Sequence, residues 1–293
     1  RIKDQSNNKL KQGCYLYELE ADATIPSEYI LLMHFIGEIK PKLEIKIQNY
    51  LLSRQNKDGG WPLFFEGESD ISASVKAYFA LKLSGLKKKH PSLVKAKSFI
   101  FKKGGAENVN VFTRISLALF GQISWNSIPY MPVEIINFPK WLPFNIYKIS
   151  YWSRTVLIPL LVIMNKKPIA NNPNSISIEE LFMNFNKSPS VKAVDSSGFF
   201  SSLFLVLDKI ARFFFPNFVS KNYKKKCVDE IYEWVSMRLN GLDGLGGIFP
   251  AMVNALIAFK IDEKNRYEKQ VKICTQAIDN LVIEKKDFAY CQP

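Results

Sequence analysis

Residues 55–61 carry the side chains whose types and spacing most suggest a defined chemical role, and that role is hydrogen bonding. The stretch reads Gln-Asn-Lys-Asp-Gly-Gly-Trp. Gly59 and Gly60 permit the positive φ angles that end a helix. Gln55 is long enough to satisfy backbone groups at a neighbouring helix end and to lie on the indole of Trp61. The spacing therefore fits a clamp between the loops of stacked helices, and it equally fits an ordinary helix-ending turn with a buried tryptophan.

The residue types that bind metals are few and scattered. The chain has two histidines, and its four cysteines lie far apart, at Cys14, Cys227, Cys274 and Cys291. Zinc sites need cysteine and histidine at short, recurring spacings, so we expect no metal site. Such widely spaced cysteines are also unlike the disulfide framework of a secreted domain, which favours a reducing cytoplasmic setting.

Composition indicates a globular protein with an excess of positive charge. The 293 residues are 47% hydrophobic and 13% aromatic, with a net charge of +13. A nucleic-acid-binding surface would show a continuous basic stripe with interleaved aromatics. The lysines are instead scattered, with local clusters at 87–89 and 224–226. We therefore expect no nucleic-acid partner, and we assign most lysines to solvated faces and some to a membrane surface.

Helical periodicity recurs along the chain, and no strong alternating strand pattern is present. The predicted helices cover residues 28–36, 45–52, 73–83, 93–101, 112–120, 152–164, 231–239, 253–260 and 271–283. No segment reaches the roughly 18 consecutive apolar residues of a membrane-spanning helix. The polar stretch 165–197 is predicted to be a surface loop. The pattern predicts an all-α fold.

An ordered set of stretches resembles the class II triterpene cyclases, and squalene–hopene cyclases in particular. Gln55, Gly59 and Trp61 resemble the QW motif of that family. The other similar stretches are 18–29, 70–81, 111–114, 131–135, 150–155 and 240–254. This resemblance implies an α/α barrel, the terpenoid cyclase toroid, built of antiparallel helix pairs. It divides the chain into a lead-in segment, 1–18, with a degenerate QW turn, and an amino-terminal barrel domain, 19–293.

The same resemblance marks what this sequence lacks. The acid of the family lies in an Asp-x-Asp-Asp motif in the carboxy-terminal half, and no aspartates in this chain have that spacing. We therefore predict no catalytic residue here, and we expect the carboxy-terminal catalytic domain to be absent and the chain alone to be inactive. The reaction of the family implies neither a metal nor an organic cofactor.

The resemblance also assigns residues to the wall of a reaction cavity. Trp152, Ile248, Pro250 and Phe112 are similar to residues that line it. Without the resemblance, Trp152 is equally a buried core indole, and Ile248 and Pro250 fit a loop that packs on its own helix.

Two charged residues are similar to a polar pair at the far end of that cavity. Glu28 and Arg114 would hold ordered water that takes the final proton or adds as hydroxyl, since a fixed water needs several polar partners. A structural salt bridge between two helices is the alternative interpretation.

Residues 198–226 combine an apolar helical face with a basic continuation. The apolar face includes Phe199, Leu203, Leu207, Ile210 and Phe214, and lysines follow at 221 and 224–226. This pattern is typical of a helix that lies in the membrane interface. A core helix with a basic tail fits the residues as well, and the resemblance favours the membrane because the family is monotopic.

The leading interpretation is the amino-terminal part of a squalene–hopene cyclase, an isomerase of hopanoid biosynthesis that cyclises squalene to hopene or hopanol by protonation. Another isoprenoid polyene cyclase and a non-catalytic, membrane-associated lipid-binding module are the alternatives. The implied partners are squalene or a similar polyene, a membrane surface, the carboxy-terminal half of the enzyme and a second copy in a homodimer. The implied location is the cytoplasmic face of a bacterial membrane.

Overall fold

The structure is a computed structural model. It describes residues 18–20, 22–142, 145–184, 199–241 and 243–293, with backbone alone for 199–205. The degenerate QW turn expected in residues 1–18 lies outside the described residues, apart from Glu18.

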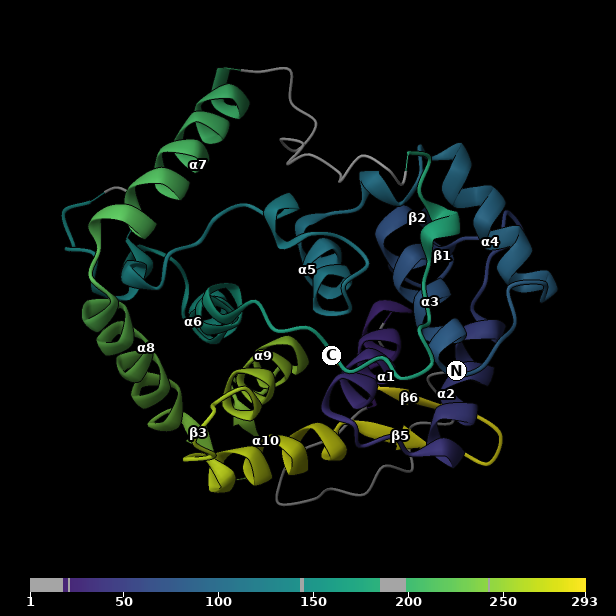
Figure 1. Ribbon diagram of the computed structural model, residues 1–293. Coiled ribbons are helices and arrows are strands. Elements are labelled where there is room, and N and C mark those ends of the chain that lie inside the picture. Colours follow the sequence, from purple (N-terminus) through teal and green to yellow (C-terminus); the bar gives the residue numbers. More distant parts are fainter. Residues whose placement is uncertain (1–17, 21, 143–144, 185–198, 242) are drawn as a thin grey trace.

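Five helices form an inner layer around a central space (Figure 1). Helix α1 lies against α3 and α9, α3 against α5, and α6 against α9. Their bounds are α1 (Thr24–Ile36), α3 (Ile71–Leu83), α5 (Val111–Leu119), α6 (Tyr151–Lys166) and α9 (Phe249–Lys260). The inner helices are rich in apolar residues on all sides, and nearly every residue of α3 is buried, as expected for helices covered on both faces.

Four helices cover the inner layer from outside. Helix α2 packs on α1, α4 on α3, α10 on α9 and α8 on α6. Their bounds are α2 (Pro41–Ser53), α4 (Pro91–Lys102), α8 (Lys221–Ser236) and α10 (Glu268–Asn280). Three inner helices are thus followed directly by their outer partner, which is the antiparallel pairing of an α/α barrel. The predicted all-α fold is confirmed.

Polar caps and cross-links bring the first turns of the inner helices to one end of the barrel, here called the mouth. Asp70 accepts from the Ala73 amide at 2.8 Å and begins α3, and Asn110 begins α5 by accepting from the Thr113 amide at 2.9 Å. The Asn110 amide in turn donates to the Ser72 hydroxyl at 3.0 Å, which joins the starts of α3 and α5.

Between α5 and α6 the chain forms short 3₁₀ turns instead of an outer helix. They are η3 (Trp125–Ser127), η4 (Val133–Asn137) and η5 (Ile146–Lys148), and η4 packs on α6 and α8. One more helix, α7 (Phe199–Phe218), leads into α8, and η2 (Ala106–Asn108) precedes α5.

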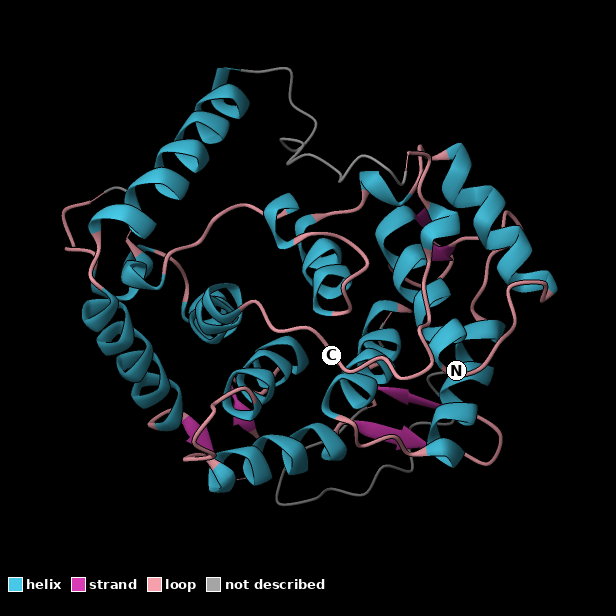
Figure 2. Cartoon of the chain, viewed as in Figure 1, coloured by secondary structure: helices cyan, strands magenta, loops and turns pink. Residues whose placement is uncertain are grey.

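Three two-stranded antiparallel hairpins stand at helix ends (Figure 2). They are β1 (Trp61–Pro62) with β2 (Ser69–Asp70), β3 (Leu239–Asn240) with β4 (Gly244–Leu245), and β5 (Val282–Glu284) with β6 (Ala289–Cys291). Strands of two or three residues are too short to display an alternating pattern, which is why the sequence did not reveal them.

The predicted and observed extents of several elements differ. The surface loop expected over 165–197 packs down within its described part, since Ile178 and Leu181 are fully buried around η6 (Glu179–Leu181). Helix α8 begins ten residues before the predicted 231, because Ser220 caps it and the lysines of its first turns are good helix formers. Within the described residues, no helix combines the length and the apolar character needed to cross a bilayer.

Candidate active-site cavity

A cavity of about 430 Å³, here called the inner cavity, lies inside the ring of inner helices. All five inner helices and the β1–β2 hairpin contribute to its lining. Its walls are largely apolar and include Leu31, Phe35, Ile115, Leu160 and Ile257. Such a space suits a nonpolar ligand, because an apolar wall binds hydrocarbon and holds water poorly.

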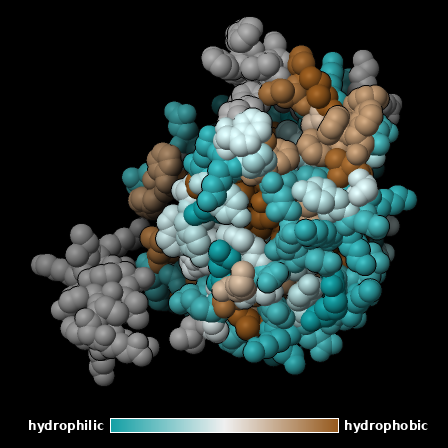
Figure 3. Space-filling model, turned by 90° about the vertical axis from the view of Figure 1, so that its left-hand side faces the viewer, coloured by the Kyte–Doolittle hydropathy of each residue, from teal (hydrophilic) through white to brown (hydrophobic). Residues whose placement is uncertain are grey.

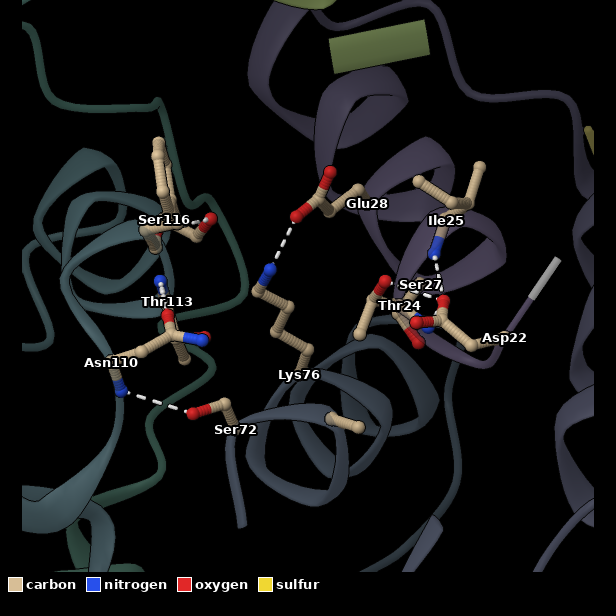
Figure 4. A network of polar contacts seen from close by, with 12 residues as sticks. Asp22, Thr24, Ile25, Ser27, Glu28, Ser72, Lys76, Asn110, Thr113 and Ser116 are labelled. Atoms are coloured by element: carbon tan, nitrogen blue, oxygen red, sulfur yellow. Dashed lines mark hydrogen bonds and ion pairs between the residues drawn. The ribbon is translucent and has the colours of Figure 1, made fainter. Parts of the chain in front are cut away.

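One ion pair interrupts the apolar wall. Lys76 of α3 is 5% exposed, and its ammonium group contacts the carboxylate of Glu28 from α1. Figure 4 shows the two side chains pointing toward each other between their helices, near the Asn110 cap. The pair balances its own charge, so the wall carries a polar group without a net charge.

Sequence reasoning missed Lys76, although a signal existed. The predicted helix over 73–83 placed apolar residues at Val75, Tyr78, Phe79 and Leu83, and Lys76 falls among them. Because α3 is buried on every side, even its lysine lies inside the protein. A lysine that falls among the apolar residues of a buried helix is therefore a sign of a buried ion pair.

The predicted partner of Glu28 has a different role. Arg114 is 5% exposed and donates to the carbonyl oxygens of Glu107 at 2.8 Å, Val109 at 3.2 Å and Ser127 at 3.4 Å. Burial lowers the pKa of its guanidinium. Among the described contacts, Glu28 pairs with Lys76 and Arg114 holds the backbone on both sides of α5. Glu28 thus forms its ion pair with Lys76, and the ordered water that Glu28 and Arg114 would hold stays a prediction.

The four predicted wall residues all lie at helix starts on the mouth. Phe112 and Pro250 line the inner cavity, Phe112 with 53% of its surface exposed. Trp152, the second residue of α6, is 57% exposed, and Ile248 is the half-buried cap of α9. The structure therefore places Phe112 and Pro250 on one lining. Trp152 and Ile248 do not line the inner cavity and lie on its rim.

The mouth also carries exposed aromatic residues of the β1–β2 hairpin. Phe64 and Phe65 are 69% and 64% exposed, and the neighbouring Leu63 lines the inner cavity. Phe64 and Phe65 line a neighbouring pocket that shares Leu63 with the inner cavity, and we call Phe64, Phe65, Phe112 and Trp152 together the mouth face. An apolar surface of this kind usually marks an interaction site.

Gln55, Gly59 and Trp61 join the loop after α2 to neighbouring elements. The Gln55 amide donates to the carbonyl oxygens of Gly59 and of Ser92 in α4, both at 2.8 Å. Trp61 is fully buried and donates its indole N–H to the Leu51 carbonyl at 2.7 Å. Gly59 has φ +96°, and a Cβ there would lie 2.5 Å from the Lys95 carbonyl. Only glycine fits this turn without strain.

Helix α7 turns its charged side to the protein and its apolar side outward. Asp208 accepts from the Tyr130 amide at 2.5 Å and from Arg212 Nε at 2.6 Å, and Arg212 also donates to the Ile128 carbonyl. The exposed apolar side chains are Val206, Leu207, Ile210, Phe213, Phe214 and Phe218. Figure 3 shows apolar residues, in brown, gathered at the top of the molecule, where α7 lies. The side chains of Phe199 and Leu203 lie outside the described part.

The three cysteines within the described residues show no sign of reactivity. Cys227, Cys274 and Cys291 are free and buried, and burial raises the pKa of the Cys274 thiol to about 12. Such a thiol is protonated at neutral pH and is a poor nucleophile. No group of histidine, cysteine or carboxylate side chains within the described residues is arranged to hold a metal ion.

Comparison with known proteins decides the family. A family model for the squalene-hopene cyclase N-terminal domain matches residues 3–287. The chain belongs to the squalene–hopene cyclase family. A probable squalene–hopene cyclase of Sinorhizobium fredii is 44% identical over 96% of this chain and 44% of its own length. The squalene–hopene cyclase of Bradyrhizobium diazoefficiens is also 44% identical, over 96% of this chain and 43% of its own.

The chain is also similar to a protein with a different name. Enfumafungin synthase of Hormonema carpetanum is 36% identical over 58% of this chain and 13% of its own length. The chain spans less than half the length of the bacterial relatives above. The family membership predicted from the ordered stretches, beginning with residues 55–61, is therefore confirmed for an amino-terminal portion.

Proposed function

We propose that this chain forms the amino-terminal wall of the reaction chamber of a squalene–hopene cyclase, which cyclises squalene to hopene or hopanol. The observation that carries the proposal is the inner cavity, a largely apolar space at the centre of the family's fold. The proton donor would come from a carboxy-terminal half, because no aspartates in this chain have the required spacing.

The lining suits a reaction that passes through carbocations. Aromatic faces attract a desolvated cation by about 2 kcal/mol without acting as nucleophiles. Phe35, Phe112 and Phe120 supply such rings on the inner cavity. The Glu28–Lys76 pair adds no net charge, so it neither repels a passing cation nor neutralises it. It is the charged pair of a lining that also includes Thr24, Asn110, Ser116 and Asn254, and it would mark where the final proton leaves.

The mouth face would meet the carboxy-terminal half. Its aromatic side chains lie at the opening of the inner cavity, so a second domain placed there would cover them and close the chamber. Trp152 and Ile248, which stand on the rim, would then line the enlarged chamber.

Helix α7 would hold the enzyme on a membrane. Asp208 and Arg212 bond the 128–130 loop, and the exposed apolar side chains of α7 would enter the headgroup region. The lysines at 221 and 224–226 follow directly, and each basic residue near an anionic surface adds about 1 kcal/mol.

A chimera tests the proposed reaction. This chain replaces the matched segment of the Bradyrhizobium relative, and the purified protein is incubated with squalene. We expect pentacyclic hydrocarbon and alcohol products by gas chromatography and mass spectrometry, with the relative itself as control. A folded chimera that leaves squalene unchanged contradicts the proposal.

The match to enfumafungin synthase supports a second candidate, a cyclase of another polyene. The same chimera is therefore given oxidosqualene in a parallel reaction. Faster turnover of oxidosqualene than of squalene would favour that candidate.

Liposome flotation tests the membrane surface. Ile210→Asp with Phe213→Asp should abolish binding of the chain to anionic vesicles. Phe288→Asp, which changes an exposed apolar residue on the β5–β6 hairpin, is the matched control and should bind normally. Equal binding by all three proteins would remove α7 from the proposal.

A further inference from the structure

A second cavity, here called the rear cavity, lies at the opposite end of the barrel from the mouth. Its volume is about 400 Å³. The carboxyl ends of α1 and α3 and the residue that ends α5 line it, together with the loop 171–176. Asn171, Asn172 and Asn174 contribute side-chain amides, and His34 stands beside them.

Two phenylalanines line both cavities. Phe35 from the last turn of α1 and Phe120 from the end of α5 belong to the inner and to the rear cavity. Their ring centroids are 6.5 Å apart in an edge-to-face arrangement. Phe79 packs against Phe120 at 5.2 Å, also edge-to-face, and fixes that ring from behind. The two rings therefore stand between the two spaces.

The two spaces differ in what they can hold. Ordered water needs two to four polar partners and about 30 Å³ for each molecule. In the rear cavity, Asn171, Asn174 and backbone groups at the helix ends can supply such partners, whereas the Asn172 amide is engaged with Ile176. The inner cavity near Phe35 and Phe120 is bounded by Leu119 and Ile257 instead. Water is therefore favoured in the rear cavity and disfavoured in the inner cavity beside the two rings.

The outer wall of the rear cavity is held in place by specific bonds. Asn172 accepts from the Ile176 amide at 3.1 Å and donates to the Ile176 carbonyl at 2.8 Å, which closes the loop on itself. Gln122 accepts from the Ile178 amide at 2.9 Å and so ties this loop to the end of α5. The polar chamber is therefore a built feature of the fold.

We propose that Phe35 and Phe120 form a water seal that determines whether the reaction ends in an alkene or an alcohol. This inference rests on the proposed function. A carbocation in the inner cavity ends by losing a proton to a base, which leaves a double bond. It ends alternatively by bonding the oxygen of water, after which the oxonium loses a proton to a second water and leaves an alcohol. The seal suppresses the second outcome by keeping water of the rear cavity out.

The test uses the chimera described above and the ratio of alcohol to alkene in its products, measured by mass spectrometry in ¹⁸O-labelled water. Phe35→Ala removes one ring of the seal, and we expect the labelled alcohol fraction to rise at least fivefold. Leu160→Ala is the matched control, because Leu160 lines the inner cavity alone and its truncation enlarges that cavity without opening the seal. Phe35→Leu, which largely fills the gap, should show a smaller rise.

The outcomes separate the two proposals. An unmodified chimera that forms no cyclised product contradicts the proposed function. A working chimera whose Phe35→Ala form keeps the original product ratio overturns the seal, and so does an equal rise with Leu160→Ala. Should Phe35→Ala be insoluble, Phe120→Leu removes the other ring at a smaller loss of core volume and must raise the alcohol fraction in the same way.

Discussion

Lys76 determines the charge balance of the inner cavity. A carboxylate and an ammonium group that are both largely removed from water stabilise the fold only while they remain paired. Lys76→Met would leave Glu28, whose side chain is 21% exposed, without its counter-charge. We expect a loss of about 3 kcal/mol in the free energy of unfolding, measured by urea denaturation.

The double variant Glu28→Gln/Lys76→Met should recover most of that loss, because it removes both charges. Lys42→Met, at an exposed position of α2, should change the stability by less than about 0.5 kcal/mol. A double variant as unstable as the single one would mean that Lys76 acts through packing of its stem and not through its charge.

Glu134 gives the fold a pH dependence of opposite sign to that of most carboxylates. It is 3% exposed, and its two carboxylate oxygens have no hydrogen-bond partner among the described residues. Burial raises its pKa, and the backbone amide of the same residue and nearby Lys224 offset only part of that effect. The folded state therefore holds this proton more tightly than the unfolded state does. Its contribution to stability is complete below the unfolded pKa and is lost as pH rises through the folded pKa.

Glu134→Gln should remove this contribution to the slope. We expect the variant to gain stability relative to the unmodified chain as pH rises from 4 to 8, measured by denaturant unfolding at each pH. A constant difference across that range would show that the carboxyl has the same pKa in both states.

Among the helices, the connection of α2 to α4 through Gln55 can be tested in isolation. Gln55→Ala deprives the Gly59 and Ser92 carbonyl oxygens of their donor, and we expect a loss of about 1–3 kcal/mol by urea unfolding. Gln276→Ala is the control. It removes an exposed side-chain hydrogen bond from Gln276 to Asn280 within α10, and the free energy of unfolding should change by less than about 0.5 kcal/mol. Equal effects would show that the tie adds nothing beyond a surface hydrogen bond.

The sequence predicted the helices well because their apolar residues recur at helical spacing and their starts carry caps. The run 73–83 and the observed α3 differ by two residues, and Asp70 marks the start that periodicity alone did not give. The hairpins and η6 were not predicted, because elements of two or three residues are too short to show a period in the sequence. The starts of helices depend on capping residues such as Ser220. Its side chain accepts one hydrogen bond from the Tyr223 amide, and periodicity does not reveal such a single contact.

The candidate site was less predictable because a cavity is made by several helices at once. Glu28, Phe112 and Pro250, which the resemblance assigned to the cavity, lie on one lining, but the resemblance gave no sign that Glu28 pairs with Lys76. The contact with Lys76 joins residues 48 positions apart and depends on the packing of α1 on α3. Likewise, the amphipathic pattern of α7 did not say which side faces the protein, and the Asp208 and Arg212 bonds settle that.

Taken whole, the molecule is a barrel whose mouth carries exposed apolar side chains. Outer helices bury the sides of the inner layer, whereas the mouth face leaves Phe64 and Phe65 more than half exposed. Large exposed apolar patches promote association in a protein that lacks its partner. The same two rings should therefore have opposite effects in the chain alone and in a molecule that also has the carboxy-terminal half.

Phe64→Ser with Phe65→Ser tests this directly. In the chain alone, we expect at least a twofold lower fraction of associated protein by analytical ultracentrifugation, because water solvates serine and the apolar patch is reduced. In the chimera, the same change should lower the melting temperature by several degrees, since two buried aromatic contacts are lost. Ile45→Ser with Val94→Ser removes comparably exposed apolar groups from the outer helices α2 and α4 and should leave the chimera unchanged. A chimera as sensitive to the control pair as to the Phe64 and Phe65 pair would show that the mouth face is ordinary surface, since its aromatic residues would gain no partner on assembly.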